Sequence, residues 1–227
     1  MIGILGYGYI GSRLHGEKIT QNQVGECDKV YYLAAQSQPG LKWTDYLPNI
    51  VLTTDVVQKC KGELVFTSTI KIFDSYKQVN PVENYEVSKK INEDIIVQAG
   101  KSGLKYQILR LANVISPDVK YGIFYELVEQ AKNGLIKYYP GAYRPFITLD
   151  QAVKAIEMEK PPGIYTVSCG AIYIEDIIKM LASKFQFKTQ KLKGEPLMLE
   201  PGWNKMRDLG WDGRNSKENI EEVLCSL

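Results

Sequence analysis

The chain has 227 residues, of which 44% are hydrophobic, and this is enough for one sizeable core and a small second lobe. A formal net charge of +2 gives no electrostatic reason to expect nucleic acid or a membrane surface as a partner. The four cysteines form no Cys-x-x-Cys pair and the single histidine is His15, which excludes a zinc site and histidine-based nucleophilic catalysis. We therefore expect no metal.

No apolar run approaches the roughly 20 residues that a membrane-spanning helix needs. The apolar residues 1–5 are too few for a signal peptide and have no basic leader. We expect a cytoplasmic protein whose cysteines stay reduced.

Apolar runs and segments of helical spacing alternate along the first 134 residues. The expected elements are a strand at 2–5, a glycine-rich turn at 6–11 that opens a short helix, a strand at 30–34, a helix at 46–60, a strand at 63–67, a helix at 85–99, a strand at 106–111 and a helix at 124–133. Strands separated by helices of this length predict right-handed crossovers and a parallel sheet covered on both faces.

The pattern changes after residue 134, where the segments become shorter. Expected there are a short apolar segment at 146–149, a helix at 150–157, a strand at 164–168, a helix at 174–183, a loop at 194–202 and a helix at 216–224. The predicted fold class is α/β, with a Rossmann-like doubly wound parallel sheet over residues 1–134, truncated after its first helix. Residues 135–227 are expected to form a small α+β substrate lobe, interleaved with the core in one compact unit.

A glycine-rich turn directly follows the first expected strand. Gly6, Gly8 and Gly11 give the spacing G-x-G-x-x-G. In such a turn the first glycine permits the tight bend, the second lets the backbone approach a pyrophosphate, and the third allows close packing of the next helix. The position of this turn predicts dinucleotide binding.

The adenosine end of that binding site is short in this sequence. An acidic residue about 20 positions further on, at the end of a second strand, normally accepts the ribose hydroxyls. Glu17 and Glu26 are candidates by position, but neither follows a convincing strand. Residues 15–29 are also too few for a full helix, strand, helix and strand, so the adenosine pocket is predicted to be truncated.

Tyr85 and Lys89 lie four residues apart on an expected helix and so share one of its faces. A tyrosine with a pKa near 10 is a poor base at neutral pH, and an ammonium one turn away favours the phenolate. The spacing alone is about what chance supplies among 15 tyrosines. The hydroxyls of Thr67, Ser68 and Thr69 supply the context, because they end a strand at the sheet edge where open α/β folds bind ligands.

These blocks together resemble the extended short-chain dehydrogenases, the group of NAD-dependent nucleotide-sugar epimerases, dehydratases and reductases. The likeness covers nearly the whole chain except the shortened segment. Its blocks, in chain order, are Gly8-Tyr9-Ile10-Gly11-Ser12, Leu33-Ala34-Ala35, Thr67-Ser68-Thr69, Tyr85-Glu86-Val87-Ser88-Lys89, Leu109-Arg110-Leu111-Ala112-Asn113-Val114, Arg144-Pro145-Phe146-Ile147 and Leu209-Gly210-Trp211.

The resemblance implies a role for each matching position. Tyr85 would be the general acid/base, Lys89 its partner and a ribose ligand, and Thr69 the hydroxyl that orients the substrate. Asn113 and Arg144 would contact the diphosphate of a nucleotide sugar. The residues that would bind NAD or NADP, besides Lys89, are Gly6, Gly8, Tyr9, Ile10, Gly11, Leu33, Ala34 and Ala35.

Three functions remain open at this point. The first is hydride transfer at a ring carbon of a nucleotide sugar by an epimerase, which the segment at Arg144 favours. The second is a deoxysugar 4-keto reductase similar to dTDP-4-dehydrorhamnose reductase, which the truncated adenosine pocket and the residues after Thr69 favour; Ile70 and Lys71 there disfavour a dehydratase. The third is a non-catalytic relative that binds a nucleotide or a protein. The family also implies a homodimer formed through the helices at 46–60 and 85–99.

Overall fold

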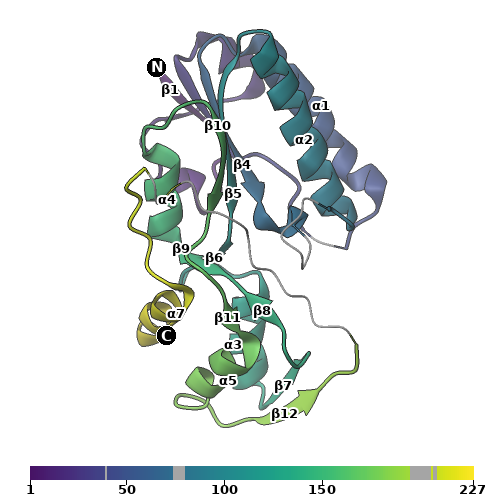
Figure 1. Ribbon diagram of the computed structural model, residues 1–227, viewed down its shortest axis with the longest axis vertical. Helices are drawn as coiled ribbons and strands as arrows, with labels where there is room; N and C mark the ends of the chain where they lie inside the picture. Colours follow the sequence, from purple (N-terminus) through teal and green to yellow (C-terminus); the bar gives the residue numbers. More distant parts are fainter. Residues whose placement is uncertain (39, 74–79, 195–205, 207–208) are drawn as a thin grey trace.

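A computed structural model of the chain describes residues 1–38, 40–73, 80–194, 206 and 209–227. Its centre is a six-stranded sheet in the order β10-β5-β4-β3-β1-β2, in which every neighbouring pair is parallel (Figure 1). The strands are β1 (Ile2–Leu5), β2 (Glu17–Lys18), β3 (Lys29–Tyr32), β4 (Glu63–Thr69), β5 (Lys105–Leu111) and β10 (Gly163–Val167). This arrangement confirms the predicted Rossmann-like α/β fold.

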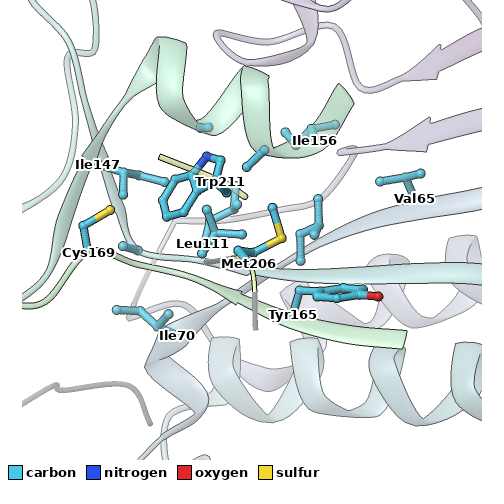
Figure 2. Close-up of a cluster of buried hydrophobic side chains, with 14 of the residues drawn as sticks. Val65, Ile70, Leu111, Ile147, Ile156, Tyr165, Cys169, Met206 and Trp211 are labelled. Atoms are coloured by element: carbon cyan, nitrogen blue, oxygen red, sulfur yellow. The ribbon is translucent and has the colours of Figure 1, made fainter. Parts of the chain in front are cut away.

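Helices cover both faces of the sheet. On one face lie α1 (Trp43–Lys59) and α2 (Asn84–Lys101), which pack against each other, and on the other lies α4 (Leu149–Glu157) (Figure 1). The first face buries an apolar cluster that includes Val30, Phe66 and Ile108. The second buries a cluster between the sheet and α4, into which Trp211 inserts from the end of the chain (Figure 2). Burial on both faces explains why the central strands are apolar without alternation.

A smaller lobe lies beyond the carboxyl ends of the strands (Figure 1). Its helices are α3 (Ile123–Lys132), α5 (Ile174–Leu181) and α7 (Ser216–Cys225), which share a third buried cluster. Its strands form three pairs, which are β6 (Asn113–Ile115) with β9 (Phe146–Thr148), β7 (Leu135–Tyr138) with β12 (Lys188–Lys191), and β8 (Tyr143–Arg144) with β11 (Ile172–Tyr173).

Local sequence signals fix the ends of the helices in this region. Thr148 Oγ1 accepts a hydrogen bond from the Gln151 amide at 3.3 Å, and Gln151 Oε1 accepts one from the Thr148 amide at 3.2 Å. This reciprocal capping box starts α4 immediately after β9. Asn215 Oδ1 caps α7 in the same way, accepting from the Glu218 amide at 3.0 Å. The short strand β9 is thus joined without a loop to the helix that covers the sheet.

Elements of the two lobes alternate along the chain on either side of the expected boundary at residue 134. Strand β10 and helix α4 lie after residue 134 but belong to the central sheet and its cover, whereas α3 lies before it and packs in the smaller lobe. Interleaving was expected, and the boundary itself stays a prediction. The loop expected at 194–202 lies, apart from Gly194, outside the described residues.

The segment between β1 and β3 differs most from the expectation. The glycine turn leads only into a single 3-10 turn, η1 (Gly11–Arg13), in place of the expected short helix. An unexpected two-residue strand, β2, follows at the sheet edge, and a 3-10 helix, η2 (Gln21–Glu26), returns the chain to β3. With so few residues the chain bends after each short element, which explains why no full helix forms. None of the described helices has the length and apolarity that crossing a bilayer requires.

Candidate active site

A cavity of about 410 Å³ opens at the carboxyl edge of the sheet, beside the ends of β1, β3 and β4. The chain leaves β1 toward β2 on one side, and β3 begins on the other side of β1. Open α/β folds bind their ligands at such a topological switch point. All eleven residues predicted for catalysis or cofactor binding line this cavity, which are Gly6, Gly8, Tyr9, Ile10, Gly11, Leu33, Ala34, Ala35, Thr69, Tyr85 and Lys89.

The three glycines of the turn have different surroundings. Gly6 has φ +106°, and a Cβ there would overlap the backbone of Ala34. A Cβ on Gly11 would overlap the Gly6 carbonyl, whereas a Cβ on Gly8 would meet nothing within 4 Å. Gly6 and Gly11 are therefore required by the bend itself, and Gly8 leaves open space on the cavity side. A pyrophosphate fits this arrangement because it can approach the Gly8 backbone closely.

The end of β3 forms the facing wall. The amides of Leu33 and Ala34 both donate to the Leu5 carbonyl, at 2.8 and 2.9 Å. These bonds hold the small side chains of Ala34 and Ala35 against the glycine turn, where both line the cavity. An extended ligand that lies across the turn therefore meets a narrow apolar wall.

Three hydroxyl residues end β4 at the same edge. Thr69 Oγ1 accepts a hydrogen bond from the Lys71 amide at 3.2 Å and caps the turn η3 (Ile70–Ile72). Its hydroxyl proton is still available to donate, since one hydroxyl both accepts and donates. Ser68 Oγ is buried and has no hydrogen-bond partner among the described residues. Both side chains line the cavity, so the Ser68 and Thr69 hydroxyls can donate hydrogen bonds to a polar ligand there.

Helix α2 brings Tyr85 and Lys89 to the cavity. Lys89 is buried, and its Nζ donates to the Thr67 carbonyl at 2.9 Å and lies 4.7 Å from the centroid of the Phe66 ring. These contacts hold the ammonium at the end of β4. The half-buried Tyr85 ring packs against Tyr46, with ring centroids 6.1 Å apart. The helix thus presents a phenol and an ammonium from one face, as the spacing predicted.

Burial dominates the protonation of both groups. It raises the pKa of Tyr85, with smaller contributions from Tyr121, Tyr46 and Glu86, and it lowers the pKa of Lys89 to about 8. In this arrangement Tyr85 is a neutral phenol at pH 7.

A buried ion pair fixes α2 against the sheet one turn beyond Lys89. The Arg110 guanidinium of β5 binds the Glu93 carboxylate through two nitrogens, with Nε–Oε1 at 3.0 Å and Nη2–Oε2 at 2.6 Å. Both side chains are nearly inaccessible, at 11% and 1% exposed. The Arg110 guanidinium carbon also lies 5.0 Å from the centroid of the Phe73 ring. This bidentate pair sets the register of the helix that carries Tyr85 and Lys89.

Neither Asn113 nor Arg144 lines the cavity. The backbone amide and Nδ2 of Asn113 both donate to the Pro145 carbonyl, at 3.2 and 2.9 Å, while its neighbours Ala112 and Val114 do line the cavity. Arg144 donates to the Tyr143 carbonyl at 3.1 Å, and burial lowers its pKa to about 10. The diphosphate-binding role of these two residues stays a prediction.

Sequence reasoning did not find one prominent residue of the cavity, Tyr121. Its ring packs on Tyr9 with centroids 5.6 Å apart, and its phenol is near enough to Tyr85 to raise the pKa of that residue. Arg13, in the turn after Tyr9, also pairs with Asp118 at 3.2 Å. No motif or spacing marks Tyr121, because only the folding of the smaller lobe brings it to the cavity.

Among the described residues, no group of three or more His, Cys, Asp or Glu side chains is arranged to hold a metal ion. A family model, described as the NAD dependent epimerase/dehydratase family, matches residues 6–161. The chain belongs to this family. A comparison with curated proteins finds no match.

Several solved structures share the fold of this chain. MoeE5 in complex with UDP-glucuronic acid and NAD is 17% identical, with a TM-score of 0.82 over 100% of this chain and 99% of that one. RMD from Pseudomonas aeruginosa complexed with NADPH is 16% identical, with a TM-score of 0.80 over 99% and 96%. UDP-N-acetylglucosamine 4-epimerase from Bacillus cereus is 19% identical, with a TM-score of 0.77 over 98% and 94%. At these identities the likeness establishes the fold.

Proposed function

We propose that the chain catalyses hydride transfer at a ring carbon of a nucleotide-linked sugar, using NAD or NADP and with Tyr85 as the acid/base. The observation that carries the proposal is the convergence of four separate segments on one cavity. The glycine turn, the end of β3, the hydroxyls that end β4 and the pair on α2 all line it. The structures similar to this one include complexes with NAD, NADPH and UDP-sugars, which fits such a ligand set.

The residues present fit a nicotinamide dinucleotide. The pyrophosphate would lie on the glycine turn at Gly8, and Ala34 and Ala35 would flank it. Lys89 would hold the ribose of the nicotinamide half, since its ammonium is already fixed at the end of β4. The bound cofactor would supply a hydride acceptor or donor beside Tyr85.

The protein's own residues would manage the proton. Thr69 orients the sugar oxygen through its hydroxyl, and Tyr85 donates its phenolic proton to that oxygen when the carbon is reduced. The Lys89 ammonium then stabilises the phenolate that remains. Asn113 and Arg144 would hold the diphosphate of the substrate, as cationic and amide donors suit such a group.

One observation favours reduction of a keto sugar as the direction of the reaction. The shortened segment between β1 and β3 offers little surface for the adenosine half, so a cofactor that leaves after each turnover suits this site better than a resident one.

An epimerase is the second candidate. It is supported by the family model and by the likeness to UDP-N-acetylglucosamine 4-epimerase, and it requires a cofactor that stays bound through oxidation and re-reduction. A non-catalytic relative is the third, motivated by the same shortened segment.

One experiment separates the three functions. The purified protein is passed through gel filtration, its nicotinamide content is measured, and it is then titrated with NADH and NADPH in a calorimeter. Release of the cofactor together with NAD(P)H-dependent reduction of a nucleotide-linked 4-keto sugar is the expected result. Retained cofactor would favour the epimerase. Binding of neither dinucleotide at millimolar concentration would leave only the non-catalytic relative.

We also propose that two copies of the chain pair through α1 and α2. On α1 the side chains of Leu47 and Val51 are exposed, Val51 by 69%. On α2, Val87, Ile91 and Ile95 are only half-buried and are spaced four residues apart. Such apolar rows on two adjacent helices suit a second copy of the same helix pair.

A further inference from the structure

The position of the catalytic residues determines which way a dinucleotide must lie in the cavity. Thr69 comes from β4 and Tyr85 and Lys89 from α2, and β4 lies on the β3 side of β1. The nicotinamide half must therefore extend from the glycine turn toward β3 and β4. The adenosine half must extend the other way, over the edge strand β2.

Strand β2 offers one acidic and one basic side chain, and the two lie on opposite faces of the strand. Glu17 is paired in register with Gly3 and Lys18 with Ile4, and successive side chains of a strand alternate. Glu17 shares a face with Gly3, and the Cys27 Sγ lies on that face, 2.6 Å from a Cβ placed on Gly3. Glu17 is therefore on the Cys27 face of the strand, and it is not among the residues that line the cavity.

The other acidic candidate, Glu26, ends η2 three residues before β3 and is not among the residues that line the cavity. Neither carboxylate is thus placed to accept the hydroxyls of an adenosine ribose over β2, which is the contact that selects NAD in dinucleotide-binding folds.

Lys18, in contrast, contacts a residue that lines the cavity. Its Nζ lies 5.7 Å from the centroid of the Tyr7 ring, and Tyr7 is part of the glycine turn and lines the cavity. The Lys18 ammonium and the Tyr7 ring are at the β2 side of the turn, where the adenosine ribose must lie. A flexible ammonium at this point is a ligand for a phosphate, and the contact with an exposed aromatic ring is weak enough to be exchanged for one.

We infer that Lys18 binds the 2′-phosphate of the adenosine ribose and makes NADP(H), rather than NAD(H), the cofactor of this chain. The inference rests on the proposed function, because it assumes that a nicotinamide dinucleotide occupies the cavity. The charge-assisted contact between Lys18 and the 2′-phosphate compensates in part for the small adenosine-binding surface of the shortened segment. It also agrees with a cofactor that exchanges at each turnover.

The test compares NADPH with NADH, and adenosine 2′,5′-bisphosphate with 5′-AMP, by calorimetric titration of the full chain. The variants are Lys18→Ala and Lys18→Glu. Lys105→Ala is the matched control, because Lys105 is an exposed lysine at the amino end of β5, three strands away from β1 and beside the opposite edge strand β10. Lys18 is also exposed, so its replacement is not expected to disturb folding, and thermal unfolding of each variant checks this.

The wild-type chain is expected to bind NADPH at least tenfold more tightly than NADH, with an affinity that falls more steeply with salt. Lys18→Ala should weaken NADPH about tenfold and leave NADH within about twofold, and Lys18→Glu should reverse the preference. Lys105→Ala should change neither affinity. The two adenosine nucleotides should follow the same pattern, because they test the adenosine half alone.

Equal binding of NADPH and NADH by the wild-type chain would overturn the role of Lys18 and leave the proposed function standing. So would an NADPH preference that survives in Lys18→Ala. Failure of both dinucleotides to bind would instead refute the proposed function itself, and the two failures are therefore distinguishable.

Discussion

At the scale of single residues, burial shifts the pKa values of Tyr85 and Lys89 in opposite directions within one turn of helix, and in both cases it favours the neutral form. Desolvation keeps the phenol neutral and makes the ammonium easier to deprotonate. Tyr85→Phe keeps the ring and its packing on Tyr46 but removes the proton that the reaction needs. Turnover should fall by a factor of about 10² to 10⁴ while the affinity for cofactor changes little. Steady-state kinetics with a parallel calorimetric titration measures both, and an unchanged turnover number would refute the assignment.

The buried Lys89 ammonium should lower the free energy of unfolding of the protein. Burial lowers its pKa from 10.5 to about 8 in the folded state, so charging it costs the folded state about 3 kcal/mol relative to the unfolded chain. Lys89→Met removes this cost and gives up the hydrogen bond to Thr67, worth about 1 kcal/mol. The free energy of unfolding should therefore rise by about 1–2 kcal/mol at pH 7, while catalysis is lost.

The pH dependence of that gain provides the check. A depressed pKa means that the unfolded chain holds more protons than the folded one between pH 8 and 10.5, so wild-type stability rises through this window. The advantage of Lys89→Met should be complete below pH 8 and shrink toward pH 10.5. Urea unfolding across this range measures it. Lys90→Met is the control, since Lys90 pairs with Asp94 near the surface, and it should show no such window.

At the scale of elements, the rows on α1 and α2 predict how the chain associates. Val51→Lys places a charge at the centre of the proposed contact between two copies and should convert a dimer to a monomer without unfolding it. The matched control is Val82→Lys, because Val82 is even more exposed, at 78%, but lies outside both helices. Light scattering after gel filtration gives the mass of each variant. A wild-type chain that is monomeric at micromolar concentration would end this proposal.

The elements that sequence reasoning found are those whose length gives a pattern. Strands β4 and β5 have seven residues each, which leaves room for consecutive apolar residues, 64–66 in β4 and 108–109 in β5, that stand out in the sequence. The edge strand β2 has two residues, and two residues show no alternation, so the strand that places Lys18 could not be predicted. The helix expected after Gly11 failed for the opposite reason: the pattern was present, but the next strand begins too soon for a full turn to continue.

The candidate site shows the same division. The glycine turn and the Tyr85–Lys89 pair are local, since a bend or one helical turn sets their geometry, and the sequence contains both. Tyr121 reaches Tyr9 across 112 positions of chain only through the packing of the smaller lobe. Asn113 pairs with Phe146 across β6 and β9 and donates to the Pro145 carbonyl, although both its neighbours line the cavity. Contacts of this kind follow from tertiary structure and leave no spacing in the sequence.

At the scale of the whole molecule, the end of the chain closes the core beneath the site. Trp211 is 3% exposed and lies between the sheet and α4, in the cluster that also contains Leu111 and Met206 (Figure 2). This cluster contains residues of the central strands and of α4, so the tryptophan connects the sheet to the helix that covers it. Trp211→Ala should lower the free energy of unfolding by about 3–5 kcal/mol, because it removes the largest apolar group of the cluster and leaves a cavity.

Two further variants separate packing from other causes. The Trp211 Nε1 is buried without a hydrogen-bond partner among the described residues, so Trp211→Phe loses volume but also removes an unsatisfied donor. Its cost should be less than half that of alanine. Trp43→Ala, at the half-buried start of α1, should cost far less than Trp211→Ala. Urea unfolding followed by circular dichroism measures all three, and equal losses for Trp211→Ala and Trp43→Ala would show that the end of the chain does not hold the core together.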